Sequence, residues 1–245
     1  MMMSTVIEGT WSQIQIAGKT ADVYEPANRQ DHDHAVLHLH GHGLETLKDN
    51  PVFSAELEQY GLPTICPHGQ RSWWTNVVCR EFDENIPPID FLCQHVVPEF
   101  ASRWNIEPPN IGLTGISMGG QGALQLAYRY SSLFPVVAAI APAVDFHNWH
   151  GRGLPIDEMF VNQEAARQAT AILQIIPLSW PKHQFLCCDP EDHEWLESLE
   201  RLSSKLYSSG IPFECDMTTS NGGHCWDYFN TMAKPTIQFV AEHLE

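Results

Sequence analysis

Short apolar segments alternate with longer amphipathic segments along most of this 245-residue chain. Short apolar runs bounded by turn residues are typical of buried strands, whereas apolar positions three or four residues apart predict helices. We expect strands over residues 11–16, 20–24, 36–39, 62–66, 110–114, 136–140, 184–188 and 212–217. We expect helices over residues 51–60, 89–104, 120–128, 164–174, 194–208 and 227–244. This alternation predicts an α/β fold with a mostly parallel central sheet and helices on both faces.

The alternation of predicted strands and helices is not interrupted by a repeat, a low-complexity tract or a linker, so we expect one domain over residues 1–245. A chain of this length buries a core large enough to fold without a metal ion or a disulfide. Residues 145–153, rich in histidine, tryptophan and glycine, are expected to be irregular.

A serine flanked by glycines, Gly115-Ile116-Ser117-Met118-Gly119, lies between the strand 110–114 and the helix 120–128. A strand, a G-x-S-x-G pentapeptide and a helix, in this order, predict a nucleophile elbow. The sharp turn strains the backbone of the serine, and the glycines keep neighbouring side chains apart. Ser117 is therefore the candidate nucleophile. The backbone N–H of Met118, at the start of the helix, is a candidate donor to an oxyanion.

Two further segments supply a candidate base and acid. His224 lies on a glycine-rich loop between the last predicted strand and the last predicted helix. Hydrolases of the α/β class carry their catalytic residues in the order Ser, Asp or Glu, His, which makes His224 the candidate base. Asp192, a few residues past the strand 184–188, is the candidate acid. Asp189 lies closer to that strand and is the alternative acid, or it caps the turn.

The segment His40-Gly41-His42-Gly43 follows the predicted strand 36–39. It resembles the HGGG-type segment whose glycines let backbone N–H groups approach an oxyanion. We expect the backbone N–H of His42 to be the second oxyanion donor, with Gly43 as the alternative.

Together these motifs resemble the esterase D and feruloyl-esterase-like family of α/β-hydrolases. The resemblance rests on the segments 39–41, 71–74, 115–120 and 222–226. It implies the α/β-hydrolase fold and hydrolysis of carboxylic esters or thioesters through an acyl-enzyme, without a cofactor. Members act on formylglutathione, feruloyl sugars and trehalose esters, among others. They usually carry glycine where this chain has Asp189.

The net charge of −17 at pH 7 arises from 30 acidic and 13 basic residues. Nucleic-acid binding needs clustered lysine and arginine, so we expect no nucleic-acid partner. No apolar window is long enough to span a bilayer, and residues 1–8 lack the pattern of a signal peptide, so we expect no membrane partner. The seven cysteines are odd in number and lie mostly in apolar runs, which is typical of reduced thiols in a cytoplasmic protein.

Five histidines lie between residues 32 and 42. His38, His40 and His42 would share one side of a strand, an arrangement compatible with a metal site. However, two of them fall on the candidate oxyanion segment, and zinc sites usually draw ligands from separate elements. We therefore expect no metal ion.

Four loop tryptophans, Trp73, Trp74, Trp149 and Trp226, are candidates for the lining of an acyl or aromatic pocket. Ordinary packing of large apolar loop residues is an equally good interpretation.

The sequence thus predicts a serine hydrolase that acts on a small-molecule ester or thioester. A serine peptidase or an acyltransferase with the same triad is one alternative, and an inactive relative that serves as a binding module is another. The presence of all three triad residue types in the expected order favours an enzyme.

Overall fold

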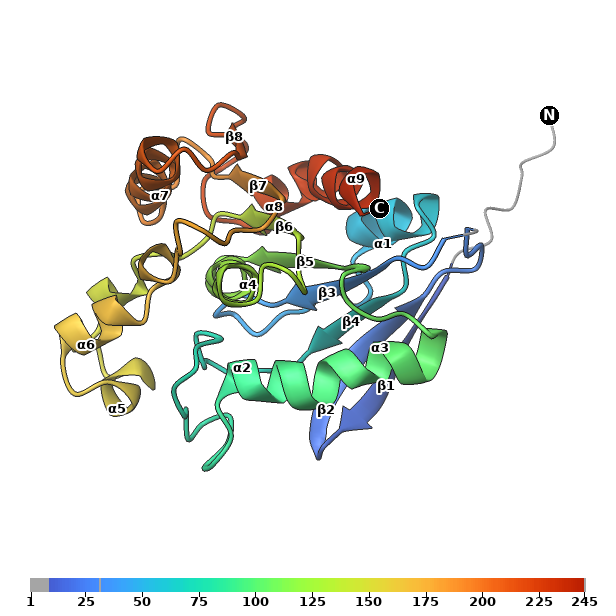
Figure 1. Cartoon of the computed structure of the whole chain (residues 1–245), viewed down its shortest axis with the longest axis horizontal. Helices are drawn as coiled ribbons and strands as arrows, with labels where there is room; N and C mark the ends of the chain where they lie inside the picture. The colour runs from blue at the N-terminus through green and yellow to red at the C-terminus, as the bar shows by residue number, and fades with distance from the viewer. Residues whose placement is uncertain (1–8, 31, 245) are drawn as a thin grey trace.

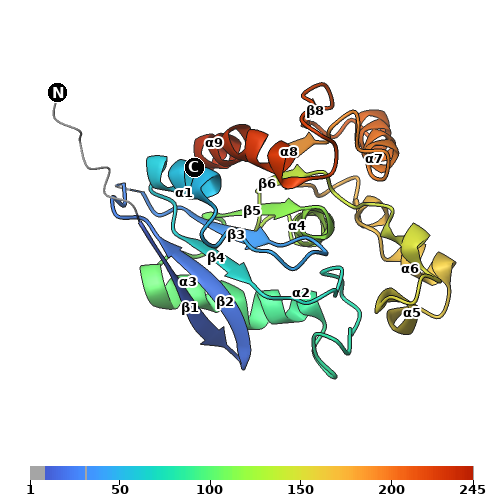
Figure 2. The ribbon, with the colours of Figure 1, turned by 180° about the vertical axis from the view of Figure 1, so that it is seen from behind.

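The computed structural model describes residues 9–30 and 32–244 (Figures 1 and 2). The segment 1–8, for which we expect no signal peptide, lies outside the described residues. Within the described part, no helix has both the length and the apolar content needed to cross a bilayer.

The strands of the described residues form one eight-stranded sheet in the order β1-β2-β4-β3-β5-β6-β7-β8. Their bounds are β1 (Thr10–Ile16), β2 (Lys19–Glu25), β3 (Ala35–Leu39), β4 (Thr64–Pro67), β5 (Ile111–Ile116), β6 (Val136–Ile140), β7 (His183–Cys187) and β8 (Glu214–Asp216). The hairpin β1–β2 is antiparallel and β2 pairs antiparallel with β4, whereas all other neighbours are parallel. The predicted α/β fold with a mostly parallel sheet is confirmed.

Helices cover both faces of this sheet. Their bounds are α1 (Pro51–Gln59), α2 (Pro88–Phe91), η1 (Leu92–Val96), α3 (Val97–Trp104), α4 (Met118–Arg129), η2 (Phe146–Trp149), α5 (Ile156–Met159), α6 (Gln163–Gln168), η3 (Ala171–Leu173), α7 (Leu196–Ser208), α8 (Trp226–Thr231) and α9 (Ala233–His243). Helices α1 and α9 pack together on one face, and α4 lies with the α2–α3 segment on the other (Figure 1). The sheet is therefore buried between two layers, as the wholly buried strands β3, β5 and β6 require.

Two predicted helices are divided in the structure. The segment 227–244 forms α8 and α9, which meet at Met232, so that Pro235 falls in the first turn of α9. A proline is tolerated there because the first N–H groups of a helix have no intrahelical acceptor. The segment 164–174 forms α6 and the 3₁₀ turn η3, because Thr170 between them is extended.

Helix α4 packs closely on the loop that follows β4. A Cβ atom added at Gly122 would lie 2.3 Å from the Cβ atom of Trp74, which is fully buried. The missing side chain of Gly122 therefore lets the indole of Trp74 pack directly on the helix backbone.

This contact predicts the sign of a stability change. Alanine normally stabilises a helix interior by about 1 kcal/mol relative to glycine. We expect Gly122→Ala instead to lower the free energy of unfolding by about 1–3 kcal/mol, because overpacking against Trp74 outweighs helix propensity. Urea unfolding measures the change, and Ser204→Ala on the exposed face of α7 is the control. A more stable Gly122→Ala protein would contradict the close packing.

Candidate active site

The turn between β5 and α4 holds Ser117 in a strained backbone conformation. Its φ and ψ angles are 57° and −117°, a region that residues other than glycine rarely adopt. The turn is fixed by close packing, since a Cβ atom at Gly119 would lie 1.8 Å from the carbonyl oxygen of Leu39. One at Gly115 would lie 2.2 Å from the carbonyl oxygen of Gly119. These contacts account for glycine at both positions of the pentapeptide.

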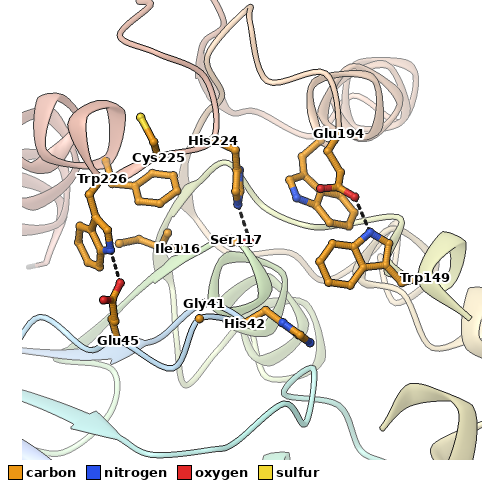
Figure 3. A pocket seen from close by; sticks show the side chains of 13 residues that line it. Gly41, His42, Glu45, Ile116, Ser117, Trp149, Glu194, His224, Cys225 and Trp226 are labelled. Atoms are coloured by element: carbon orange, nitrogen blue, oxygen red, sulfur yellow. Dashed lines mark hydrogen bonds between the residues drawn. The ribbon is translucent and has the colours of Figure 1, made fainter. Parts of the chain in front are cut away.

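His224 reaches Ser117 from the loop between β8 and α8. Its Nε2 atom lies 3.0 Å from Ser117 Oγ (Figure 3). Its Nδ1 atom lies 2.7 Å from Asp192 Oδ2. The ring of Phe229 packs edge-on against the imidazole, with 5.2 Å between ring centroids. The structure thus brings Ser117, His224 and Asp192 into one chain of hydrogen bonds.

Asp192 is a buried carboxylate on the turn that follows β7. Burial raises its pKa, but the hydrogen bond and electrostatic attraction of the His224 ring, with two backbone N–H donors, outweigh this effect and leave the pKa below its ordinary value. Those N–H groups belong to Glu194 and Trp195 and lie 3.1 Å from Oδ1. Because an ionised carboxylate only accepts hydrogen bonds, Nδ1 of His224 carries the proton and Nε2 faces Ser117 as an acceptor.

The segment after β3 passes directly beside Ser117. A Cβ atom at Gly41 would lie 3.4 Å from the Cβ atom of Ser117. The buried His40 holds this segment, because its Nδ1 donates to the Gly41 carbonyl (2.7 Å) and its Nε2 accepts from Gly69 N–H (2.9 Å). Burial lowers the pKa of His40 to about 4, which keeps the ring neutral.

Two backbone N–H groups beside Ser117 are free to bind a ligand. Among the described residues, the N–H groups of His42 and Met118 have no protein acceptor. Met118 is the first residue of α4, where an N–H group has no partner within the helix.

A cavity of about 300 Å³ opens at Ser117, His42 and His224 (Figure 3). It is lined by Gly41, His42, Gly43, Glu45, Ile116, Ser117, Trp149, Glu194, Trp195, His224, Cys225, Trp226 and Phe229. The Ser117 hydroxyl and the His224 imidazole therefore lie in a partly apolar pocket of a size suited to a small ligand.

A family model described as "Putative esterase" matches residues 20–232. The chain belongs to this family. The esterase is a carboxylic ester hydrolase, in agreement with the resemblance seen in its motifs. No curated protein matches it in sequence.

Solved structures share the α/β-hydrolase fold of this esterase. A ferulic acid esterase superposes with a TM-score of 0.75 at 14% identity, covering 96% of this chain and 98% of its own. An S-formylglutathione hydrolase from Agrobacterium tumefaciens superposes with a TM-score of 0.77 at 15% identity, covering 99% of this chain and 98% of its own. An S-formylglutathione hydrolase from Staphylococcus aureus superposes with a TM-score of 0.76 at 12% identity, covering 95% of this chain and 99% of its own.

The structure divides the four candidate tryptophans between the two interpretations that the sequence allows. Trp226 lines the cavity, but Trp73 and Trp74 do not, because both are fully buried beneath it. The ring of Trp73 stacks on Phe146 at 5.0 Å, and Trp74 Nε1 donates to the carbonyl of His40. These two residues support the loops of the esterase rather than contact a ligand.

Trp149 and Trp195 join Trp226 in the cavity wall. Trp149 was a candidate from its irregular segment, whereas Trp195 was not predicted. Its signal in the sequence is its position three residues after Asp192, on the same turn.

The histidines between residues 32 and 42 do not converge on one point. His32 and His34 stack on each other at 4.9 Å, and His38 lies buried against Thr114 in the sheet. Within the described residues, no group of three or more histidine, cysteine, aspartate or glutamate side chains is arranged to hold a metal ion.

Asp189, the alternative acid, does not contact His224. It is fully buried and accepts four hydrogen bonds, from Glu191 N–H (2.8 Å), Ser220 Oγ (2.9 Å), Asn221 N–H (2.6 Å) and Gly223 N–H (2.9 Å). Burial raises its pKa, but these donors outweigh that effect and leave the pKa below its ordinary value. Asp189 therefore ties the loop that carries His224 to the turn that carries Asp192.

The loss of these contacts should be measurable. In Asp189→Asn the amide NH₂ replaces an accepting oxygen, so we expect the free energy of unfolding at pH 7 to fall by about 1–3 kcal/mol. A carboxyl group with a lowered folded pKa stabilises above its unfolded pKa of about 3.9, and this stabilisation is lost as the pH falls through the folded pKa. The difference between wild type and Asp189→Asn should therefore shrink below pH 4.

Urea unfolding between pH 7 and pH 3 tests this expectation, with the exposed Glu200→Gln of α7 as a control of equal charge. Equal stability of the Asp189→Asn protein and wild type at pH 7 would refute the role of Asp189 in tying the loop.

Proposed function

We propose that Ser117, His224 and Asp192 hydrolyse a small carboxylic ester or thioester through an acyl-enzyme. The observation that carries this proposal is the hydrogen-bond chain from Asp192 Oδ2 through the His224 ring to Ser117 Oγ, at 2.7 and 3.0 Å. A nucleophile, a base within hydrogen-bond reach and a group that orients the base are the parts that nucleophilic catalysis requires.

In the first half of the proposed reaction, Ser117 Oγ attacks the acyl carbon while His224 Nε2 takes the hydroxyl proton. Asp192 stabilises the imidazolium that forms. The tetrahedral intermediate then collapses, and the bond to the leaving oxygen or sulfur breaks. His224 gives its proton to that leaving atom, and the acyl group stays on Ser117.

In the second half, water takes the place of the leaving group. His224 Nε2 accepts a proton from this water as its oxygen attacks the acyl carbon. Collapse of the second intermediate breaks the bond to Ser117 Oγ, which regains the proton from His224. The carboxylic acid leaves, and the enzyme returns to its starting state.

Both tetrahedral intermediates carry a negative oxygen. We propose the backbone N–H groups of His42 and Met118 as its donors. Three observations support this role: neither N–H group has a protein acceptor among the described residues, Met118 directly follows Ser117, and His42 lines the same cavity as Ser117.

A cavity of about 300 Å³ supports a small-molecule substrate rather than a polymer held along its length. Two of the solved relatives are named for a thioester, S-formylglutathione, and one for ferulic acid esters. These names support esters and thioesters as the substrate class to test.

We also propose that the esterase works in a reducing compartment, the cytoplasm. All seven cysteines carry free thiols, and Cys66, Cys79, Cys187 and Cys188 are buried. Reduced thiols are typical of cytoplasmic proteins.

Substitution of the triad tests the function directly. We expect Ser117→Ala, His224→Ala and Asp192→Asn each to lower kcat for p-nitrophenyl acetate and p-nitrophenyl butyrate by between about 10⁴- and 10⁶-fold. Ser204→Ala, on the exposed face of α7, should keep wild-type kcat. Release of p-nitrophenol measures the rates.

The variant Asp189→Asn tests whether Asp192 or Asp189 is the acid that orients His224. This variant leaves the carboxylate of Asp192 on His224, so its kcat should fall far less than that of Asp192→Asn. A larger loss in Asp189→Asn would move the acid to Asp189, and wild-type rates in Ser117→Ala would refute the proposal as a whole.

A further inference from the structure

Two indole–carboxylate pairs stand in the wall of the cavity. Trp226 Nε1 donates to Glu45 Oε2, and Trp149 Nε1 donates to Glu194 Oε1. In Figure 3 these pairs lie on either side of Ser117. Each hydrogen bond holds a carboxylate at the edge of an indole ring that lines the cavity.

The Trp149–Glu194 pair already binds a positively charged side chain of the same chain, Arg152. The guanidinium of Arg152 lies 3.5 Å from Glu194 Oε1 and 5.3 Å from the centroid of the Trp149 ring. This side of the cavity thus shows a positive group bound by an indole and a carboxylate together, and the charge of Glu194 is compensated within the chain.

The pair at Glu45 has no such partner. Among the described residues, no lysine, arginine or histidine forms an ion pair with Glu45, and the cavity lining contains no lysine or arginine. The chain as a whole has 30 acidic and 13 basic residues, so the surrounding field does not compensate this charge either.

The Glu45 pair is joined to the catalytic base by aromatic contacts. The Trp226 ring packs edge-on against Phe229 with 5.6 Å between centroids, and Phe229 packs edge-on against His224 at 5.2 Å. A group bound at Glu45 and Trp226 would therefore occupy the same cavity as Ser117.

An aromatic face beside an uncompensated carboxylate attracts an alkylammonium group through the ring quadrupole and the charge. The same carboxylate repels an anionic group. A neutral polyol would find a hydrogen-bond acceptor at Glu45 but would gain nothing from its charge.

On the basis of the proposed function, we propose that this esterase prefers esters that carry a positively charged ammonium group, which binds between Glu45 and Trp226. This preference concerns which esters bind and does not change the reaction steps proposed for Ser117, His224 and Asp192.

Isosteric ester pairs test the preference without a change of shape. Butyrylcholine carries a quaternary nitrogen in its alcohol part, and 3,3-dimethylbutyl butyrate carries a quaternary carbon at the same position. The p-nitrophenyl esters of 4-(trimethylammonio)butyrate and 5,5-dimethylhexanoate make the same comparison on the acyl side. We expect kcat/KM to favour the cationic member of at least one pair by about tenfold, as one cation–π contact and one exposed ion pair together provide.

Glu45→Gln keeps an acceptor for Trp226 Nε1 but removes the charge. We expect it to reduce the cationic preference to about one- to threefold. Glu200→Gln, on the exposed face of α7 and outside the cavity lining, removes the same charge from the protein and should keep the wild-type ratio. The wild-type ratio should also fall between 20 and 300 mM salt, because screening weakens an exposed pair.

Ratios near one for both pairs, or an equal loss in Glu45→Gln and Glu200→Gln, would overturn this inference. Hydrolysis of the neutral esters, lost in Ser117→Ala, would in that case leave the triad proposal standing. Hydrolysis of neither member of any pair, without labelling of Ser117 by a fluorophosphonate, would refute both.

Discussion

The close approach of β5, α4 and β3 around Ser117 is the constraint on which the rest of this molecule depends. Gly119 lies so near the carbonyl of Leu39 that any side chain would collide with it, and Gly115 meets the backbone of Gly119 in the same way. This packing holds Ser117 at a positive φ of 57°. The serine then stands at the carboxyl edge of the sheet, where the loops after β3, β7 and β8 can reach it.

Two buried carboxylates on the turn after β7 both position His224. Asp192 contacts the His224 ring, while Asp189 accepts hydrogen bonds from the loop that carries it. The parallel pairing of β7 with β8 brings that turn and that loop side by side. Both carboxyl groups have lowered pKa values for the same reason, since donors around each outweigh its burial. The orientation of the His224 imidazole thus depends on the order of the strands as well as on its contact with Asp192.

The sequence predicts those features that local backbone chemistry or chain order encodes. A glycine-flanked serine between a strand and a helix is a local motif that predicts a sharp turn at that serine. The parallel order of the strands predicts that Asp192 and His224 lie at the same edge of the sheet. Side-chain direction on loops is not encoded in this way. Trp73 and Trp74 both have positive φ angles, and they turn inward under α4, which no spacing in the sequence reveals. The break at Met232, by contrast, has a signal in the sequence, because Pro235 fits the first turn of a helix and not its interior.

The central claim is that Ser117 is a nucleophile activated by His224 and held by Asp192. Labelling of the purified protein with a fluorophosphonate, followed by mass spectrometry of its peptides, tests this claim most directly. We predict one label per chain, on the peptide that contains Ser117, with a labelling rate that falls at least about a hundredfold in His224→Ala. A label on another residue, or an equal rate in wild type and His224→Ala, would contradict the account.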